Sequence, residues 1–306
     1  MKKFLFVLLS IIVIFILILA SQVKDDIPKD VLMKKYSDNL SKFIKVGELE
    51  VHYKDEGSGT PLLLLHGVGS SLHTWDGWTK NLKDTYRVIR LDLPGTGLTG
   101  PNSEHNYAIK TYVNFLKDFL DKINVKTFHV AGNSLGGQIA WQFCLTYPDR
   151  ITKMILIDSG GFPFEHKNFA LKITKNPIVK ILGEYITPKS LADDGLKEAY
   201  GDPLLIKPEI FDRYYELLLR KGNRKAYLTM TNFKFEDRTQ ELININIPVL
   251  IMWGGRDKWI PVDYAYKFHI EIKDSRVILY GNLGHIPMEE SPEKTAKDAK
   301  EFFQNG

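Results

Sequence analysis

The run Gly132-Asn133-Ser134-Leu135-Gly136 has the residue types and spacing of a serine nucleophile. It reads G-x-S-x-G, with an apolar strand-like segment over residues 127–131 before it and a helical pattern over residues 138–145 after it. A serine in a sharp turn between a strand and a helix presents its hydroxyl above the sheet edge, and flanking glycines avoid collision with neighbouring backbone. The pattern therefore predicts Ser134 as a nucleophile.

A serine nucleophile needs a base, and the base needs a carboxylate that orients it. Of the three histidines downstream of Ser134, we predict His285 as the base, because it lies on a glycine-containing loop after the strand-like residues 276–280. His166 lies in a polar, irregular stretch, and His269 lies within an expected helix. Neither has the placement of a base that reaches over a nucleophile.

The acid is expected at the end of another strand. Residues 248–253 have the pattern of a buried strand, and Asp257 follows in the turn after it, so we predict Asp257 as the acid. Asp158 ends the strand-like run 154–157 and is the competing candidate. The expected role of the acid is to hold the imidazole tautomer and to stabilise the imidazolium.

Acyl transfer also needs hydrogen-bond donors that point at the developing oxyanion. The backbone N–H of Leu135, the residue after the nucleophile, is one expected donor. The apolar strand over residues 61–65 runs into a glycine-containing loop, which offers the N–H of Val68 as the second donor. His66 precedes the nucleophile and adjoins this strand, so we expect a hydrogen-bonded structural histidine there rather than a base.

Five landmarks, in this order and at this spacing, resemble the α/β-hydrolase fold family, within its large group of esterases, lipases and epoxide-hydrolase-like enzymes. They are residues 66–69, 92–97, 132–137, 255–257 and 284–287, and the resemblance spans roughly residues 43–303. It implies an α/β fold with a mostly parallel eight-stranded sheet flanked by helices and a helical cap insertion. No cofactor is expected for such an enzyme.

Strands and helices alternate along the chain, which indicates a mostly parallel sheet covered on both faces. The alternation stops after residue 161 and resumes near residue 247, with helical stretches but no convincing strand between. We therefore predict a hydrolase core over residues 43–160 and 241–306, with a helical cap over residues 161–240. Most apolar side chains of the cap are expected to hold the cap together, and a minority to line an acyl pocket.

The first residues form a basic and then strongly apolar segment. Two lysines precede the uncharged run 4–20, which is longer than the apolar core of most cleavable signals and has Ile18 where a small residue is wanted. We therefore predict a signal anchor over residues 1–23, followed by a juxtamembrane linker over residues 24–42. The lysines should stay cytoplasmic and place the catalytic domain outside. Cleavage of the segment, giving a secreted or periplasmic enzyme, is the alternative.

Composition excludes several other classes of protein. The chain of 306 residues suffices for one large domain with an insertion, and its net charge of +4 is interspersed in sign, so no nucleic-acid surface is expected. Its single cysteine, Cys144, excludes an intramolecular disulfide and is expected to be a buried packing residue. No paired histidines stand at ligand spacing, so we expect no catalytic metal.

The nucleophile separates the chemistries found in this family. Haloalkane dehalogenases and epoxide hydrolases of similar pattern carry aspartate where this chain has Ser134. A serine instead implies an acyl-enzyme that water then hydrolyses. The main prediction is therefore a carboxylic-ester hydrolase, esterase-like or lipase-like, that acts on a small-molecule ester or an acyl lipid.

Other activities stay open at this point. A carbon–carbon bond hydrolase of the meta-cleavage-product type is one alternative, since Asn133 and the cap residue Arg213 resemble substrate-binding residues of that group. Ser70 and Ile286 depart from it, because that group tends to have proline and tryptophan there. A cofactor-free haloperoxidase or perhydrolase and a thioesterase are further alternatives. A non-catalytic binding protein is disfavoured, since all three predicted triad residues are present.

Overall fold

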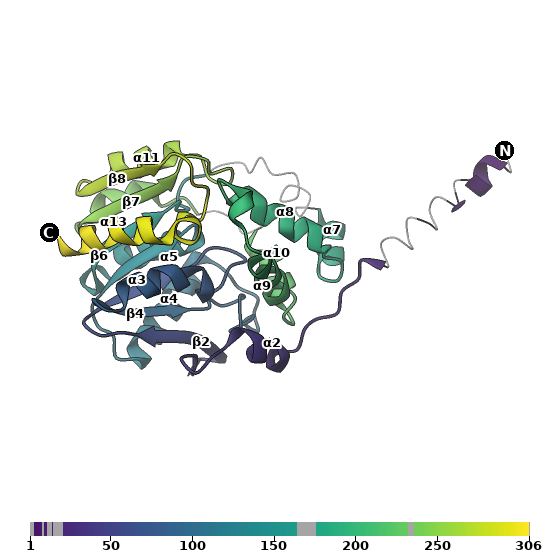
Figure 1. Ribbon diagram of the computed structural model, residues 1–306, viewed down its shortest axis with the longest axis horizontal. Helices are drawn as coiled ribbons and strands as arrows, with labels where there is room; N and C mark the ends of the chain where they lie inside the picture. Colours follow the sequence, from purple (N-terminus) through teal and green to yellow (C-terminus); the bar gives the residue numbers. More distant parts are fainter. Residues whose placement is uncertain are drawn as a thin grey trace.

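The computed structural model describes residues 3–7, 9–10, 14, 21–163, 176–231 and 236–305 (Figure 1). The predicted signal anchor therefore lies mostly outside the described residues, as does His166. Among the helices that the described ranges contain, none is both long and apolar enough to span a bilayer.

An eight-stranded sheet forms the centre of the molecule, in the order β1-β2-β4-β3-β5-β6-β7-β8. Its strands are β1 (Lys42–Val46), β2 (Leu49–Glu56), β3 (Thr60–Leu65), β4 (Tyr86–Leu91), β5 (Phe128–Asn133), β6 (Ile151–Ile157), β7 (Val249–Gly254) and β8 (Ser275–Tyr280). Strand β2 pairs antiparallel with β1 and β4, and all other neighbours are parallel. This confirms the predicted mostly parallel eight-stranded sheet.

Helices cover both faces of the sheet because its central strands are apolar on both faces. Successive leucines of β3 belong alternately to two apolar layers. The first layer includes residues of α4 (Ile109–Lys122), α5 (Leu135–Thr146) and α11 (Asp263–Glu271), and the second includes residues of α3 (Asp76–Leu82), α12 (Pro287–Glu290) and α13 (Pro292–Gln304). Cys144 lies on α5 and is buried, as predicted.

In the described residues between β6 and β7, four α-helices sit together to the right of the sheet in Figure 1. They are α7 (Pro177–Gly183), α8 (Lys189–Ala199), α9 (Pro208–Leu218) and α10 (Asn223–Met230). No strand interrupts them in the described part of this segment. We refer to these four helices as the cap; the boundaries at residues 161 and 240 stay a prediction.

The segment predicted as a juxtamembrane linker is folded onto the globular part of the chain. It contains helix α2 (Lys29–Tyr36), whose Leu32 is buried in a small cluster with Leu98 and Leu217. Ahead of α2, the backbone forms isolated bridges to the cap, Val23 to Ile186 and Ile27 to Arg220. The N-terminal segment therefore joins the globular part of the molecule next to the cap.

Candidate active site

Ser134 occupies the predicted turn between strand β5 and helix α5. Its backbone angles are φ 54° and ψ −116°, a strained conformation for a residue other than glycine. The turn is held by a hydrogen bond from Ser134 N–H to Ile157 O, 3.0 Å long. A Cβ atom at Gly132 would collide with the backbone of α5, and one at Gly136 would collide with the backbone of Leu65. The structure thus confirms why both glycines of the motif are needed.

The side chains of His285 and Asp257 are paired with each other. His285 Nδ1 lies 2.7 Å from Asp257 Oδ2, and both side chains are buried. The other carboxylate oxygen, Oδ1, accepts hydrogen bonds from the N–H groups of Trp259 (2.7 Å) and Ile260 (3.0 Å). Because the carboxylate accepts only, Nδ1 carries the proton of the neutral ring, and the lone pair is left on Nε2. That is the tautomer a general base requires.

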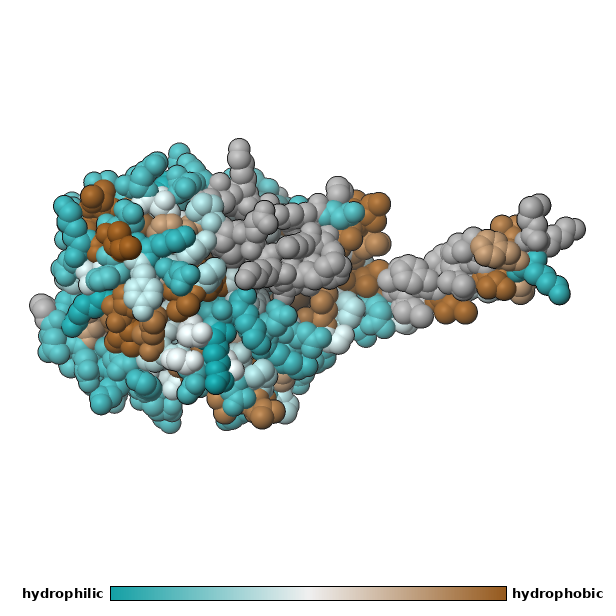
Figure 2. Space-filling view, turned by 90° about the horizontal axis from the view of Figure 1, so that it is seen from above, coloured by the Kyte–Doolittle hydropathy of each residue, from teal (hydrophilic) through white to brown (hydrophobic). Residues whose placement is uncertain are grey.

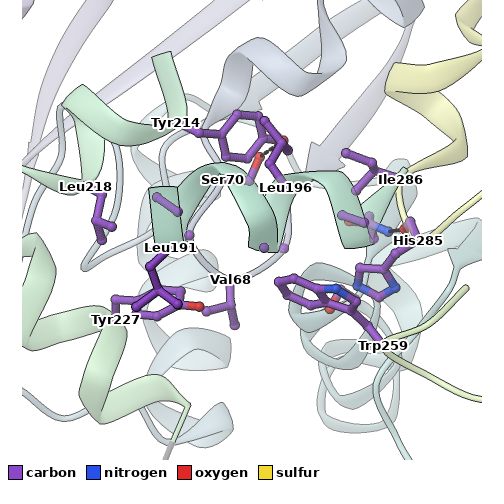
Figure 3. Close-up of a pocket in the computed structure, with 17 residues that line it drawn as sticks. Val68, Ser70, Leu191, Leu196, Tyr214, Leu218, Tyr227, Trp259, His285 and Ile286 are labelled. Carbon is purple, nitrogen blue, oxygen red and sulfur yellow. Dashed lines mark hydrogen bonds between the residues drawn. The ribbon is translucent and has the colours of Figure 1, made fainter. Parts of the chain in front are cut away.

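Ser134 and His285 line one pocket. Their side chains are not hydrogen-bonded to each other in this structure. Catalytic hydrogen bonds of this kind are often long or poorly aligned before substrate binds. Trp259 stacks on the imidazole, with ring centroids 5.4 Å apart and an interplanar angle of 20°, as Figure 3 shows. The stacking limits rotation of the His285 ring and keeps its edge facing the pocket.

The backbone of His285 is fixed from two sides. Asn133 Nδ2 donates to His285 O (2.9 Å) and to Ile157 O (3.2 Å), and His285 N–H donates to Ala199 O of the cap (2.7 Å). Asn133 lines the pocket, but both of its amide hydrogens are used by main-chain carbonyls. These contacts make Asn133 a positioning residue for the histidine loop, while its predicted role in substrate binding stays a prediction.

Asp158, the competing acid, lies beside Asp257 and is not paired with His285. It is completely buried, and its Oδ1 accepts a 2.9 Å hydrogen bond from Gly254 N–H. Burial, together with the negative charge of Asp257, raises the pKa of Asp158 well above its usual value. Asp158 Oδ2 accepts no hydrogen bond. The raised pKa favours the protonated form of Asp158, in which Oδ2 carries the proton and can donate it to Asp257, the predicted acid.

These three groups also have the types of metal ligands, with one ligand atom from each within 4.8 Å of the others. The hydrogen bond between His285 Nδ1 and Asp257 uses the ring nitrogen that would otherwise face a metal. A protonated Asp158 is in addition a poor ligand. The arrangement therefore fits proton transfer better than metal binding.

The loop after β3 carries the predicted second oxyanion donor. His66, at its start, is buried, with Nδ1 2.8 Å from Gly67 O, and its Nε2 accepts from Leu93 N–H (3.0 Å). Burial lowers the pKa of His66, so this histidine is neutral and structural, as predicted. Val68 follows on the same loop and lines the pocket, while Leu135 is the first residue of α5, where an N–H has no partner within the helix. Their oxyanion role stays a prediction.

Arg213 is not where a substrate-binding cation is expected. Its guanidinium forms an ion pair with Glu289 and is not among the residues that line the pocket. Glu289 also accepts from Tyr214 Oη (2.8 Å) and from Thr74 Oγ1. Glu289, on α12, thus links cap helix α9 to the core. It lies shortly after His285 in the sequence. The geometry gives Arg213 a structural role, and nothing in it supports the predicted substrate contact.

The pocket between the strand ends and the cap has a volume of about 110 Å³, well above the ~10–15 Å³ that one water molecule needs. Most of its labelled walls in Figure 3 are apolar or aromatic. The lining residues are Gly67, Val68, Gly69, Ser70, Asn133, Ser134, Leu191, Ala192, Gly195, Leu196, Ala199, Tyr214, Leu218, Tyr227, Trp259, His285 and Ile286. None of these described residues is a lysine, an arginine or a carboxylate.

Three features of the site have no simple signal in the sequence. The stacking of Trp259 on His285, the support of Asp257 by Asp158 and the Glu289 cluster all depend on how distant segments fold together. Only the position of Trp259, two residues after the acid, offers a local hint. Asp158 was identified as a strand-end acid, although in a different role.

The comparisons with known proteins give the same fold. Residues 60–187 match a family described as the alpha/beta hydrolase fold. A 2-hydroxy-6-oxononadienedioate/2-hydroxy-6-oxononatrienedioate hydrolase of Paraburkholderia phymatum is 27% identical over 281 residues, which cover 83% of this chain and 92% of that protein.

Two solved structures are similar over more of the chain. A membrane phospholipase A, described as a bacterial virulence factor, is 26% identical with a TM-score of 0.75. The match covers 100% of this chain and 100% of that one. A putative lipase of Acinetobacter baumannii is 26% identical with a TM-score of 0.76, over 92% of this chain and 97% of that one. The chain has the α/β-hydrolase fold, and its similarity to these proteins identifies the enzyme as a hydrolase.

Proposed function

We propose that this hydrolase cleaves carboxylic esters with an apolar acyl group, using Ser134, His285 and Asp257 as its catalytic triad. The observation that carries the proposal is the pocket, in which a serine on a strand-to-helix turn faces a cavity with apolar walls and no charged lining residue among those described. An uncharged acyl chain can enter such a cavity without leaving a buried charge unpaired.

In the proposed mechanism, Ser134 Oγ attacks the ester carbonyl while His285 Nε2 takes its proton. Asp257 holds the ring tautomer and stabilises the imidazolium. The N–H groups of Val68 and Leu135 donate to the oxyanion of the tetrahedral intermediate. His285 then protonates the leaving alcohol, and a water molecule activated by the same base hydrolyses the acyl-enzyme.

The cap supplies the acyl-binding walls in this proposal. Leu191 and Leu196 of α8 and Leu218 of α9 face the cavity (Figure 3). Each methylene group buried against such walls is worth ~0.8 kcal/mol. We therefore expect KM to fall as the acyl chain lengthens, until the cavity is filled.

The proposal includes a membrane location. Residues 1–23 are proposed to anchor the enzyme through a single N-terminal helix, with the catalytic domain extracytoplasmic; secretion after cleavage is the alternative. Two lysines before an uncharged run support an anchor. The membrane phospholipase A, which matches over the full length of both chains, supports a lipid ester as the substrate.

A carbon–carbon bond hydrolase is the second candidate, and the curated relatives favour it over an esterase. Several are named as 2-hydroxy-6-oxononadienedioate hydrolases, at 25–28% identity. That name describes a substrate with two carboxylates, which a buried site recognises through cationic partners. The described lining of this pocket has no lysine or arginine, and Arg213 is paired with Glu289. On geometry we therefore place ester hydrolysis first.

One panel of substrates separates the two candidates. The purified enzyme would be assayed with nitrophenyl esters from acetyl to dodecanoyl, with a 2-hydroxy-6-oxo-dienedioate and with a thioester, and Ser134→Ala would serve as the control. The proposal expects kcat/KM to be highest for an ester of intermediate or long chain. A higher kcat/KM for the dienedioate would establish the carbon–carbon hydrolase instead.

A further inference from the structure

Helix α7 of the cap carries an apolar stripe on its outer side. Ile178, Ile181 and Leu182 follow the i, i+3, i+4 spacing of one helical face, and Tyr185 continues it at i+7 in the turn after the helix. Their exposed fractions are 68%, 62%, 43% and 58%. A surface helix of a globular protein normally turns its apolar stripe toward the core. We call these four side chains the α7 face.

The opposite side of α7 explains why this stripe points outward. Gly183 approaches helix α10 so closely that a Cβ atom there would lie 3.1 Å from Leu228 Cδ1. Val179 is partly buried on the same inner side. The helix is therefore held against the cap by its small residues. Turning the stripe inward would replace this close packing with bulky side chains that have no room.

The N-terminal segment reaches the globular part beside the α7 face. Lys24 N–H donates to Tyr185 O (3.0 Å), and Val23 is bridged to Ile186. Arg224 holds both segments, with hydrogen bonds to Tyr185 O (3.0 Å) and Asp26 (2.6 Å). Figures 1 and 2 show α7 and hydrophobic surface (brown) where the tail meets the globular part. The uncharged run 4–20 thus ends three residues before this junction.

We propose that the α7 face docks on a lipid bilayer, next to the point where the N-terminal apolar segment enters it. A bilayer is the one apolar phase that accommodates both the run 4–20 and an adjoining exposed stripe. Lys180 on α7 and Lys24 at the junction are placed to keep their charges at the headgroups while their stems cover apolar surface. The arrangement is that of an amphipathic helix lying in the membrane interface.

This orientation also brings the pocket toward the lipid. Leu191 lines the pocket and is 49% exposed, and it lies on α8, which follows α7 directly in the chain. With α7 docked, a membrane-borne acyl chain has a short route into the pocket past Leu191. This consequence rests on the proposed ester hydrolysis, whereas docking itself does not.

Contact of the α7 face with lipid can be measured on the full-length enzyme in phosphatidylcholine–phosphatidylglycerol vesicles. A fluorophore would be attached at Ile181→Cys in a Cys144→Ser background and quenched by lipids with a nitroxide in the acyl chain. The matched control is Ile270→Cys, since Ile270 is 77% exposed and lies on α11, which Figure 1 shows beside β8 and well away from α7.

We expect strong quenching of the label at position 181 and little at position 270. Equal, weak quenching at both positions would overturn the proposal. A spin label at position 181 provides a second readout. If it detects a second label within a few nanometres and no contact with lipid, the proposal is overturned, because the α7 face is then an interface between two copies of this chain. Circular dichroism of each labelled variant checks that it is folded.

A second measurement uses a variant of the face itself. Ile181→Ser should lower the rate on a phospholipid in the vesicle by up to roughly tenfold, the factor that corresponds to keeping one such side chain in water. Its rate on a soluble short-chain ester should be unchanged, because position 181 is outside the pocket. Equal loss on both substrates would contradict docking. If the wild-type enzyme hydrolysed no ester at all, the proposed function would fail, while the quenching experiment would still decide the docking.

Discussion

The strand ends of the core and the helices of the cap contribute to the same pocket in different ways. Ser134, Asp257 and His285 follow strands of the core, and hydrogen bonds that involve main-chain groups fix each of them. The cap contributes aliphatic and aromatic walls and, on α7, an exposed apolar stripe. Under the proposed function, the core determines the reaction, whereas the cap determines which acyl group reaches the triad and from where.

The strongest way to break this division is to remove the nucleophile. Ser134→Ala should reduce kcat by about 10⁴–10⁶, since removal of a triad member in serine hydrolases has effects of this size. Turnover of a nitrophenyl ester measures the loss, and an unchanged urea midpoint verifies the fold. A variant that keeps a tenth or more of the wild-type rate would show that another group is the nucleophile.

The two neighbouring acids offer a sharper test within the core. Asp257→Asn should lower kcat by about 10⁴, because an amide in place of the carboxylate favours the wrong imidazole tautomer. Asp158→Asn should lower it less than tenfold, because an asparagine can still accept from Gly254 N–H and donate to Asp257. Measured on one ester, the reverse order of effects would transfer the acid role to Asp158.

The fold and the turn that carries Ser134 could be predicted because their signals are local. A strand, a glycine-flanked turn and a helix are adjacent around Ser134, and the loops with Asp257 and His285 each follow a recognisable strand. The pairing of Arg213 with Glu289 had no local signal, because Glu289 lies 76 residues away and only the folded chain brings the two together. For the same reason, the local sequence pattern could not predict that the Asn133 side chain holds the loop of His285. The substrate contact of Arg213 stays a prediction.

A substitution in the cap should have a smaller effect, which changes the KM for long-chain esters and leaves the kcat for short ones unchanged. Leu218→Ala removes part of a pocket wall, and each methylene contact is worth ~0.8 kcal/mol, so KM for a long-chain ester should rise several-fold. The kcat for an acetyl ester should stay close to the wild-type value. An equal fall of kcat for both esters would mean that the cap also shapes the catalytic step.

The final prediction concerns the dependence of folding stability on pH. The folded-state pKa of Asp158 is raised, so the unfolded chain releases this proton first as the pH rises above about 4. The contribution of Asp158 to stability should therefore fall by about 1.4 kcal/mol per pH unit until its folded pKa is reached. Asp158→Asn should remove this slope, so its stability relative to the wild type should increase as the pH rises above about 4. Urea midpoints of both proteins at four pH values test this, and a difference that does not change with pH would contradict a protonated Asp158.

Covalent labelling with a fluorophosphonate tests the central claim, an activated serine in the pocket, without knowledge of the substrate. The account predicts one adduct per chain, mapped by mass spectrometry to Ser134, and much slower labelling in Asp257→Asn. Absence of an adduct at Ser134 in folded wild-type enzyme, or labelling at the same rate when Asp257 is replaced, would contradict it.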